Sequence, residues 1–190
     1  MGDVRQIVFR SRGYIPVPFA ALLLALARTN LLSFVSGLLI AAFGEGIRIW
    51  ALSYTGMGTR TRKVGAERLV TDGPYAYIRN PLYLGNLFLG LGFCVAAWAW
   101  MPWMIPVFLA GFSLQYALIV SLEEETLRKI FGRTYEDYAV HVPRFLPRFS
   151  PYGGSREIAP DLRKALRSER DTFFTIAICM ILIAIRWYIR

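Results

Sequence analysis

Residues 82–121 read LYLGNLFLGLGFCVAAWAWMPWMIPVFLAGFSLQYALIVS and contain no charged side chain. A helix needs about 20 residues to cross the hydrocarbon core of a bilayer, so this stretch is long enough to cross twice. Its centre, Trp98–Trp103, combines a proline with tryptophans, which favour the membrane–water interface. The stretch therefore predicts a hairpin of two transmembrane helices, Leu82–Trp100 and Met101–Ser121.

Three further apolar blocks lie outside this hairpin: Tyr14–Ala27, Leu31–Tyr54 and Thr172–Ile189. The first is short, and apolar residues of the basic N-terminal arm extend it. No small-residue cleavage site follows that arm, so an uncleaved first span is expected. The sequence thus predicts an all-α, polytopic membrane helix bundle of about five transmembrane helices, formed by residues 1–190 as a single domain.

The composition supports a membrane protein and excludes other classes. Hydrophobic residues make up 55% of the chain, and the formal net charge is +9. The basic residues lie in loops beside apolar spans, which favours anionic lipid headgroups over nucleic acid as partners. Cys94 and Cys179 lie inside apolar blocks without metal-ligand spacing, so reduced thiols and no metal are expected. No G-x-G-x-x-G joins a strand pattern to a helix pattern, which excludes a soluble nucleotide-binding fold.

Lysine and arginine are unevenly divided between the two sides of the predicted bundle. The N-terminal arm, the loop Gly56–Asn80 and the stretch Glu123–Arg170 are basic, whereas the opposite short connections hold only Arg28. Basic loops favour the cytoplasmic side. The N-terminus and both long loops are therefore expected to be cytoplasmic, in a multi-pass protein of a bacterial inner membrane.

Two further helices are expected outside the spans. The segment Thr134–His141 is predicted to be helical, and it follows Gly132, a natural helix C-cap. Between Ala159 and Arg170, apolar residues recur at helical spacing among basic ones. That pattern is typical of a helix that lies along the membrane surface, here ahead of the last span.

Glu45 and Arg48 lie three residues apart inside the block Leu31–Tyr54. A charged group at this depth costs about 2.5 to 3.5 kcal/mol on insertion scales, so the two side chains are expected to face the bundle interior and to pair. Two interpretations stay open. The pair is either a structural device that fixes helix register or a part of the functional site.

The loop Gly65–Gly85 ends where a helix is predicted to begin. Asn80 and Pro81 mark this start, because proline suits the first helical turn. Free N–H groups are expected near Tyr83 and Gly85, and such a helix end can hold a carboxylate or a ribose hydroxyl. An ordinary helix start without a ligand is the alternative.

Three consecutive acids, Glu123, Glu124 and Glu125, continue the fourth span as it leaves the membrane. Successive helical residues point about 100° apart, so at most two of these carboxylates can face one pocket. The alternative is a solvated acidic helix end whose carboxylates pair with Arg128 and Lys129.

Two motifs in fixed order carry a resemblance to a known family. The first is LVTDGPYAYIRNPLYLG, residues 69–85; the second joins Glu123–Glu125 to FGRTYEDY, residues 131–138. Together they resemble the isoprenylcysteine carboxyl methyltransferase family, to which phospholipid methyltransferases are similar. The resemblance covers residues 44–147 and implies an integral membrane methyltransferase.

The resemblance also implies a cofactor. S-adenosylmethionine would bind between the cytoplasmic ends of the helices and leave as S-adenosylhomocysteine. Carried over by position, its contacts would be Arg68, Leu69, Val70, Tyr75, Asn80, Pro81, Leu82, Tyr83, Glu123 and Glu124. Arg48 and Arg79 are candidates for orienting an anionic acceptor. Methyl displacement needs positioning and well-placed dipoles rather than a metal, and no catalytic residue is assigned.

Two positions depart from the family pattern. Eukaryotic members typically have histidine where this chain has Asn80, and asparagine cannot titrate near neutral pH. The prenylcysteine enzymes have an arginine one helical turn before the acidic cluster, where this chain has Ile119. Both departures weaken the expectation that the acceptor is a prenylated protein.

The predicted function is therefore transfer of a methyl group from S-adenosylmethionine to a lipidic or small-molecule acceptor that arrives from the bilayer. Carboxylate, amine and thiol acceptors stay open, with phospholipid N-methylation as one alternative. The alternative from another class is a non-catalytic transporter or assembly protein on the same scaffold, which the charged pair Glu45 and Arg48 would suit.

Overall fold

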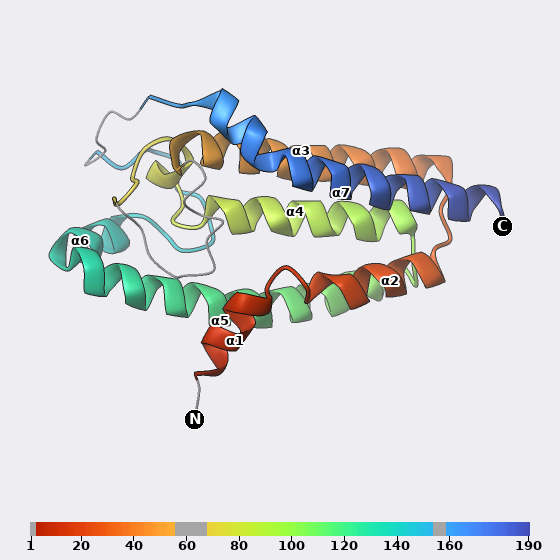
Figure 1. Ribbon diagram of the computed structural model, residues 1–190, viewed down its shortest axis with the longest axis horizontal. Helices are drawn as coiled ribbons and strands as arrows, with labels where there is room; N and C mark the ends of the chain where they lie inside the picture. The colour runs from red at the N-terminus through yellow and green to blue at the C-terminus, as the bar shows by residue number, and fades with distance from the viewer. Residues whose placement is uncertain (1–2, 56–67, 154–158) are drawn as a thin grey trace.

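The computed structural model describes residues 3–55, 68–153 and 159–190. Within these ranges the chain is helical and contains no strand, which confirms the all-α prediction (Figure 1). In chain order the elements are α1 Val4–Ser11, α2 Pro16–Leu26, α3 Leu31–Thr55, the 3-10 helix η2 Gly73–Ala76, α4 Pro81–Ala97, α5 Met104–Phe131, α6 Arg133–His141 and α7 Leu162–Tyr188.

The described helices include three, α3, α5 and α7, that are long and apolar enough to cross a bilayer. The pair α1 and α2 forms a fourth candidate that is bent by 56°. Pro16 starts α2 after the break, because proline has no N–H to continue the preceding helix. The helix α4 has 17 residues, the short end of the range for a span. The described residues therefore confirm a polytopic helical bundle but give three to four candidate spans instead of about five, because the first is bent and α4 is short.

The backbones of α3 and α4 nearly touch. A Cβ atom added to Gly44 in α3 would lie 2.6 Å from the carbonyl oxygen of Gly85 in α4, and one added to Gly85 would lie 2.7 Å from the oxygen of Gly44. Small residues allow helices to approach this closely inside a membrane. The contact fixes the N-terminal half of α4 beside α3.

The predicted hairpin is present between α4 and α5. Trp98 and Trp100 in the connection have positive φ angles of 49° and 46°, and Trp103 is 62% exposed. The helix α5 continues beyond the predicted end of the span to Phe131 and is ended by Gly132, whose φ is 53°. The acidic cluster is therefore part of the same rigid helix as the span.

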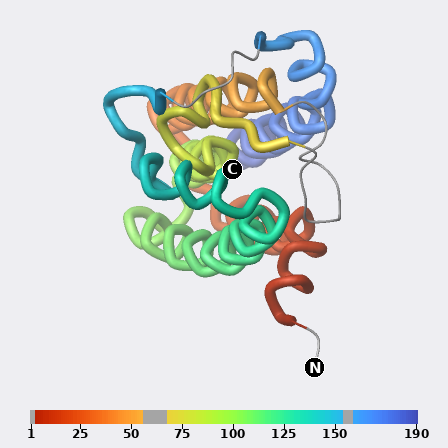
Figure 2. The backbone as a smooth tube through the Cα atoms, turned by 90° about the vertical axis from the view of Figure 1, so that its left-hand side faces the viewer, coloured from red at the N-terminus to blue at the C-terminus, as the bar shows by residue number. Residues whose placement is uncertain are grey.

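A cap of short segments covers the end of the bundle that carries α6, which faces the viewer in Figure 2. The backbone N–H of Arg79 donates to the carbonyl of Pro143 at 2.9 Å, and that of Tyr152 donates to Ala76 at 3.0 Å. The Tyr138 hydroxyl of α6 donates to the Tyr75 carbonyl at 2.7 Å. The predicted helix α6 and the segment after it thus hold the loop that leads into α4.

The basic segment before the last span does not form a separate surface helix. It supplies the N-terminal turns of α7, which run without a break from Leu162 to Tyr188. Asp161 caps α7 by accepting from the N–H of Lys164, and its own N–H donates to Ser53 of α3 at 2.8 Å. Glu169 is fully buried. The periodicity was helical, as predicted, but one face of the segment packs in the bundle.

Candidate functional site

One large cavity contains every residue that the sequence predicted for the site. Its volume is about 2140 Å³. The predicted residues among its lining are Arg48, Arg68, Leu69, Val70, Tyr75, Arg79, Asn80, Pro81, Leu82, Tyr83, Glu123 and Glu124. Residues 56–67, which include the start of the predicted loop, lie outside the described residues. The fold therefore brings the described parts of both motifs to a single space.

The start of α4 forms part of the cavity wall. Asn80 is its N-cap residue, but the Asn80 side chain donates to the carbonyl of Arg144 at 3.1 Å instead of capping the helix. The Tyr83 N–H donates to the Asn80 carbonyl at 3.1 Å, and Gly85 packs against α3. The Tyr83 N–H is therefore used by the first turn of α4, and the expectation of free N–H groups near Tyr83 does not hold for Tyr83 itself.

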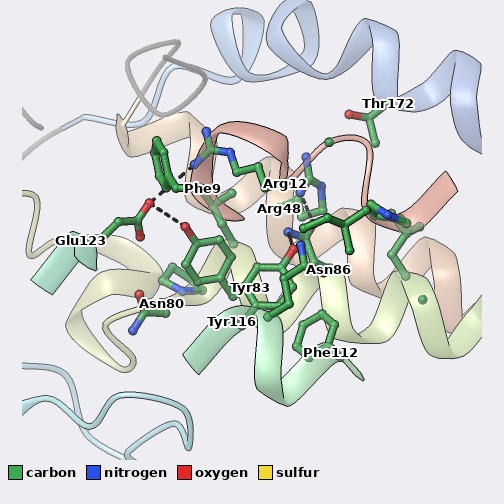
Figure 3. A pocket seen from close by; sticks show the side chains of 18 of the residues that line it. Phe9, Arg12, Arg48, Asn80, Tyr83, Asn86, Phe112, Tyr116, Glu123 and Thr172 are labelled. Carbon is green, nitrogen blue, oxygen red and sulfur yellow. Dashed lines mark hydrogen bonds and ion pairs between the residues drawn. The ribbon is translucent and has the colours of Figure 1, made fainter. Parts of the chain in front are cut away.

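Glu123 joins three helices at the polar end of the cavity (Figure 3). The Tyr83 hydroxyl of α4 donates to the Oε1 atom of Glu123 at 2.7 Å. The guanidinium of Arg12, which follows α1, lies 3.6 Å from the same oxygen and 4.2 Å from the centre of the Phe9 ring. The carboxylate thus faces the cavity, with one hydroxyl donor and one cation beside it.

Glu124 is held by arginines. Its side chain receives two hydrogen bonds from Arg144, at 2.9 and 2.6 Å, and lies 3.2 Å from Arg79 and 3.7 Å from Arg128. These bonds to Glu124 raise the pKa of Arg144 above its ordinary value. The Nε atom of Arg79 is buried and has no hydrogen-bond partner in the described parts of the chain. This cluster carries more positive than negative charge.

Glu125 points away from the cavity. It pairs with Arg5 of α1 at 2.9 Å and with Lys129 at 2.6 Å. The prediction that at most two of the three consecutive acids share one pocket is confirmed, because Glu123 and Glu124 line the cavity and Glu125 does not.

The loop before α4 is held by buried aromatic side chains. Tyr75 lines the cavity and is 9% exposed, and burial raises its pKa above the ordinary value, so its hydroxyl stays protonated. Leu69 packs in a cluster with Tyr135 and Tyr138 of α6. Arg68 donates to the carbonyl of Tyr54 at 3.2 Å. These contacts attach the loop before α4 to α3 and α6.

Arg48 stands at the centre of a second polar cluster, farther inside the bundle. Its Nε atom donates to Glu45 at 3.1 Å, and one terminal nitrogen donates to both oxygens of Glu169 at 2.8 Å. The other terminal nitrogen donates to the Oδ1 atom of Asn86. The predicted pairing of Glu45 with Arg48 is confirmed. Arg48 also lines the cavity, so the same side chain can fix helix register and belong to the site.

Beyond these polar clusters the cavity continues into apolar space. Phe19 and Leu24 of α2, Phe108 and Phe112 of α5, and Ile183 of α7 are among the residues that line this part, which we call the apolar extension. The cavity therefore has one charged end and one end suited to a hydrocarbon chain. The described residues contain no group of three or more His, Cys, Asp or Glu side chains placed to hold a metal ion.

Comparison with known proteins identifies the family. The sequence profile described as phospholipid methyltransferase matches residues 32–134. The chain belongs to the phospholipid methyltransferase family. The matched region runs from α3 through α4 and α5 to the start of α6, so this family region supplies the α4 start and the acidic cluster.

Curated relatives of this phospholipid methyltransferase family member include two kinds of protein. The cobalt-zinc-cadmium resistance protein CzcN of Cupriavidus metallidurans is 30% identical over 137 residues, which are 70% of this chain and 58% of CzcN. Protein-S-isoprenylcysteine O-methyltransferases are 33% identical in Homo sapiens and 30% in Xenopus laevis, over 60% of this chain and 40% of each relative. No solved structure matches the chain. The expected kinship with membrane methyltransferases is confirmed.

Several cavity residues of this phospholipid methyltransferase family member were missed by sequence reasoning. Asn86 and Tyr116 gave no signal, because single polar residues inside spans have no spacing pattern. Arg12 was considered only as part of the basic N-terminal arm. Glu169 lies in a segment whose many charges suggested solvent exposure. One signal could have found it: on the apolar face of that segment it is an acid without a basic residue beside it, so a partner on another helix was to be expected.

Proposed function

We propose that this protein transfers a methyl group from S-adenosylmethionine to a lipidic or small-molecule acceptor at the cavity between α2, α4, α5 and α7. The observation that carries the proposal is that residues of both motifs and the apolar extension line the same cavity. Small-molecule sites commonly occupy about 300 to 1000 Å³, so a cavity of about 2140 Å³ has room for two ligands.

The charged end of the cavity fits the polar groups of the cofactor. Glu123 offers a carboxylate to an ammonium group or to ribose hydroxyls, and it is the candidate with fewer protein partners than Glu124. Arg79 has an unused Nε–H in the described structure, which suits a carboxylate. Glu124 then acts through Arg79 and Arg144, by holding them in place.

S-adenosylmethionine, when bound, supplies an electrophilic methyl group, whose bond to the sulfonium sulfur breaks as its bond to the acceptor atom forms, with S-adenosylhomocysteine as the other product. The protein's own part is positioning and exclusion of water. Tyr83 orients the Glu123 carboxylate, and buried Tyr75, in the loop before α4, forms part of the cavity wall and excludes water there. An ammonium or thiol acceptor must also lose a proton, whereas a carboxylate need not.

The proposed setting is a bacterial inner membrane, with α1, α6 and the loop before α4 on the cytoplasmic side. The excess of basic residues in these segments supports this orientation. A water-soluble cofactor would then reach the charged end from the cytoplasm, and a lipidic acceptor would reach the apolar extension from the bilayer.

Calorimetric titration of the purified chain with S-adenosylhomocysteine tests the cofactor site. We expect binding by the wild type and at least tenfold weaker binding by Glu123→Gln, because the amide loses the charge that an ammonium group needs. Glu125→Gln is the matched control, since Glu125 lies outside the cavity, and it should bind as the wild type does. Absence of wild-type binding at millimolar ligand would count against the proposal.

The family description, phospholipid methyltransferase, supports a phospholipid as one alternative acceptor, and its amine is the group that would take the methyl. Incubation with methyl-labelled S-adenosylmethionine and separation into lipid, peptide and small-molecule fractions decides between acceptors. Label in none of these fractions, together with intact cofactor binding, would favour the non-catalytic transporter or assembly protein instead.

A further inference from the structure

A chain of side chains connects the two polar clusters along the cavity wall. Arg48 donates to Asn86, the Nδ2 atom of Asn86 donates to the Tyr116 hydroxyl at 2.9 Å, and the Tyr116 ring lies against the Tyr83 ring with centroids 4.6 Å apart. The last member, Tyr83, donates to Glu123. All of these residues line the cavity, and Figure 3 shows them side by side.

The chemistry of this chain fixes the direction of each hydrogen bond. A guanidinium only donates, so the Asn86 atom that faces Arg48 must be the carbonyl oxygen Oδ1. The amide nitrogen of Asn86 must then face Tyr116, which makes the Tyr116 oxygen an acceptor. The hydrogen of the Tyr116 hydroxyl is left over. None of the hydrogen bonds among the described residues uses it.

Tyr116 places this unused donor between the charged end of the cavity and the apolar extension. On one side its ring contacts Tyr83, next to Glu123, and on the other it contacts Phe112, at a centroid distance of 4.2 Å, in the apolar extension. Tyr116 therefore marks the junction where the head of a lipid would meet the charged end. Gln115, its neighbour in sequence, also lines the cavity and has a buried Nε2 without a described partner.

Arg48, the arginine bonded to Asn86 at this junction, is already neutralised. Arg48 contacts two carboxylates, Glu45 and Glu169, and so it has no charge to spare for an anionic head group. An uncommitted hydroxyl donor instead favours a group that accepts hydrogen bonds. An ammonium group only donates, so it would leave the Tyr116 hydrogen unmatched.

We propose that Tyr116 determines acceptor specificity by donating a hydrogen bond to an oxygen atom of a lipidic acceptor whose chain lies in the apolar extension. This inference rests on the proposed function, because it assigns the acceptor half of the same cavity. Asn86 and Arg48 are positioning residues: they act by forcing the Tyr116 hydrogen toward the cavity.

The test uses two probes with equal chains and opposite hydrogen-bonding heads, myristate and tetradecylamine. Native mass spectrometry of the purified protein, titrated with each probe, gives the two affinities. We expect the wild type to prefer myristate, and Tyr116→Phe to weaken myristate binding by about two- to tenfold, the range of one hydrogen bond, with no change for tetradecylamine. Tyr14→Phe is the matched control, because Tyr14 is 68% exposed.

A second variant keeps the tyrosine. In Asn86→Asp the carboxylate can only accept, so it takes the Tyr116 hydrogen, and the preference for myristate should fall as it does in Tyr116→Phe. Equal wild-type affinity for the two probes, binding of neither, or an unchanged preference in both variants would overturn the inference. Binding of S-adenosylhomocysteine is measured on the same samples, so that failure of the cofactor proposal is seen separately.

Discussion

Arg48 of α3 lies 2.8 Å from both carboxylate oxygens of Glu169 in α7, across 121 positions of sequence. Glu169 is fully buried, and Arg48 is also engaged by Glu45 within α3. The ion pair joins the last helix to the family region at the height of the cavity. Because Arg48 also lines the cavity, loss of this ion pair would change both the stability of the bundle and the shape of the cavity wall.

Removal of the Glu169 carboxylate should destabilise the protein strongly. In Glu169→Ala the Arg48 guanidinium keeps Glu45 as its counter-charge but loses its hydrogen bonds to Glu169, and loss of a hydrogen bond to a charged group typically costs about 1.5 to 3 kcal/mol. The loss is measured by unfolding of the purified protein in mixed micelles. Asp137→Asn, on the exposed face of α6, should change the free energy of unfolding by less than about 0.5 kcal/mol. Equal stability of the two variants would show that the pair contributes no net stability.

The close approach of α3 and α4 gives a prediction with a control in the same helix. In Gly44→Ala the new methyl group meets backbone atoms of Gly85 and Leu89 at 2.6 and 2.7 Å, so the helices must separate, at a cost of about 1 to 3 kcal/mol. Nothing lies within 4 Å of a Cβ atom at Gly46, so Gly46→Ala should keep or slightly raise stability through its helix propensity.

Thermal unfolding in detergent compares these two glycine variants. Cofactor binding should fall in Gly44→Ala as well, because α4 carries Asn80, Tyr83 and Asn86 into the cavity wall. An unaltered melting temperature in Gly44→Ala would mean that the two backbones can shift without loss.

The sequence was informative where a pattern repeats and uninformative where single residues pair across the bundle. Long apolar blocks predicted the helices, and Asn80-Pro81 and Gly132 marked the helix ends within a residue or two. The two motifs also predicted one shared pocket. The bend after α1 and the shortness of α4 depend on packing, which hydropathy does not report.

The pairings could not be predicted for a physical reason. Hydrogen bonds such as Asn86 to Tyr116 connect helices that approach each other only in the folded bundle. The burial of Glu169 could not be predicted for the same reason. The basic residues around it in α7 are exposed, whereas Glu169 faces Arg48 of α3. Only the three-dimensional arrangement of α3, α4, α5 and α7 distinguishes these residues from surface positions.

Glu124 should hold two loops at once. It binds Arg79, in the loop before α4, and Arg144, in the segment after α6. In Glu124→Gln both arginines lose their counter-charge, so amide hydrogen exchange should speed up by at least tenfold at the N–H groups of Arg79 and Tyr152, which bond between the two loops. Glu125→Gln is the control, because its partners are α1 and Lys129. Unchanged exchange in Glu124→Gln would assign the stability of these loops to aromatic packing alone.

The buried tyrosines of the cap predict how stability depends on pH. Burial raises the pKa of Tyr75, Tyr135 and Tyr138 above the ordinary value of 10.0. A group whose folded-state pKa is raised contributes stability that is complete below the unfolded-state pKa and is lost as the pH rises toward the folded-state pKa. The free energy of unfolding should therefore be independent of these groups up to about pH 9 and should decline above about pH 10.

Thermal unfolding at about pH 8 and about pH 11 measures this decline, and Tyr138→Phe provides the comparison. This variant loses the hydrogen bond to the Tyr75 carbonyl and so starts from lower stability, but it has one buried phenol fewer and should decline less steeply. Tyr188→Phe is the control, because Tyr188 is 91% exposed and lies outside the cap. Equal slopes in all three proteins would mean that the cap opens before the protein unfolds.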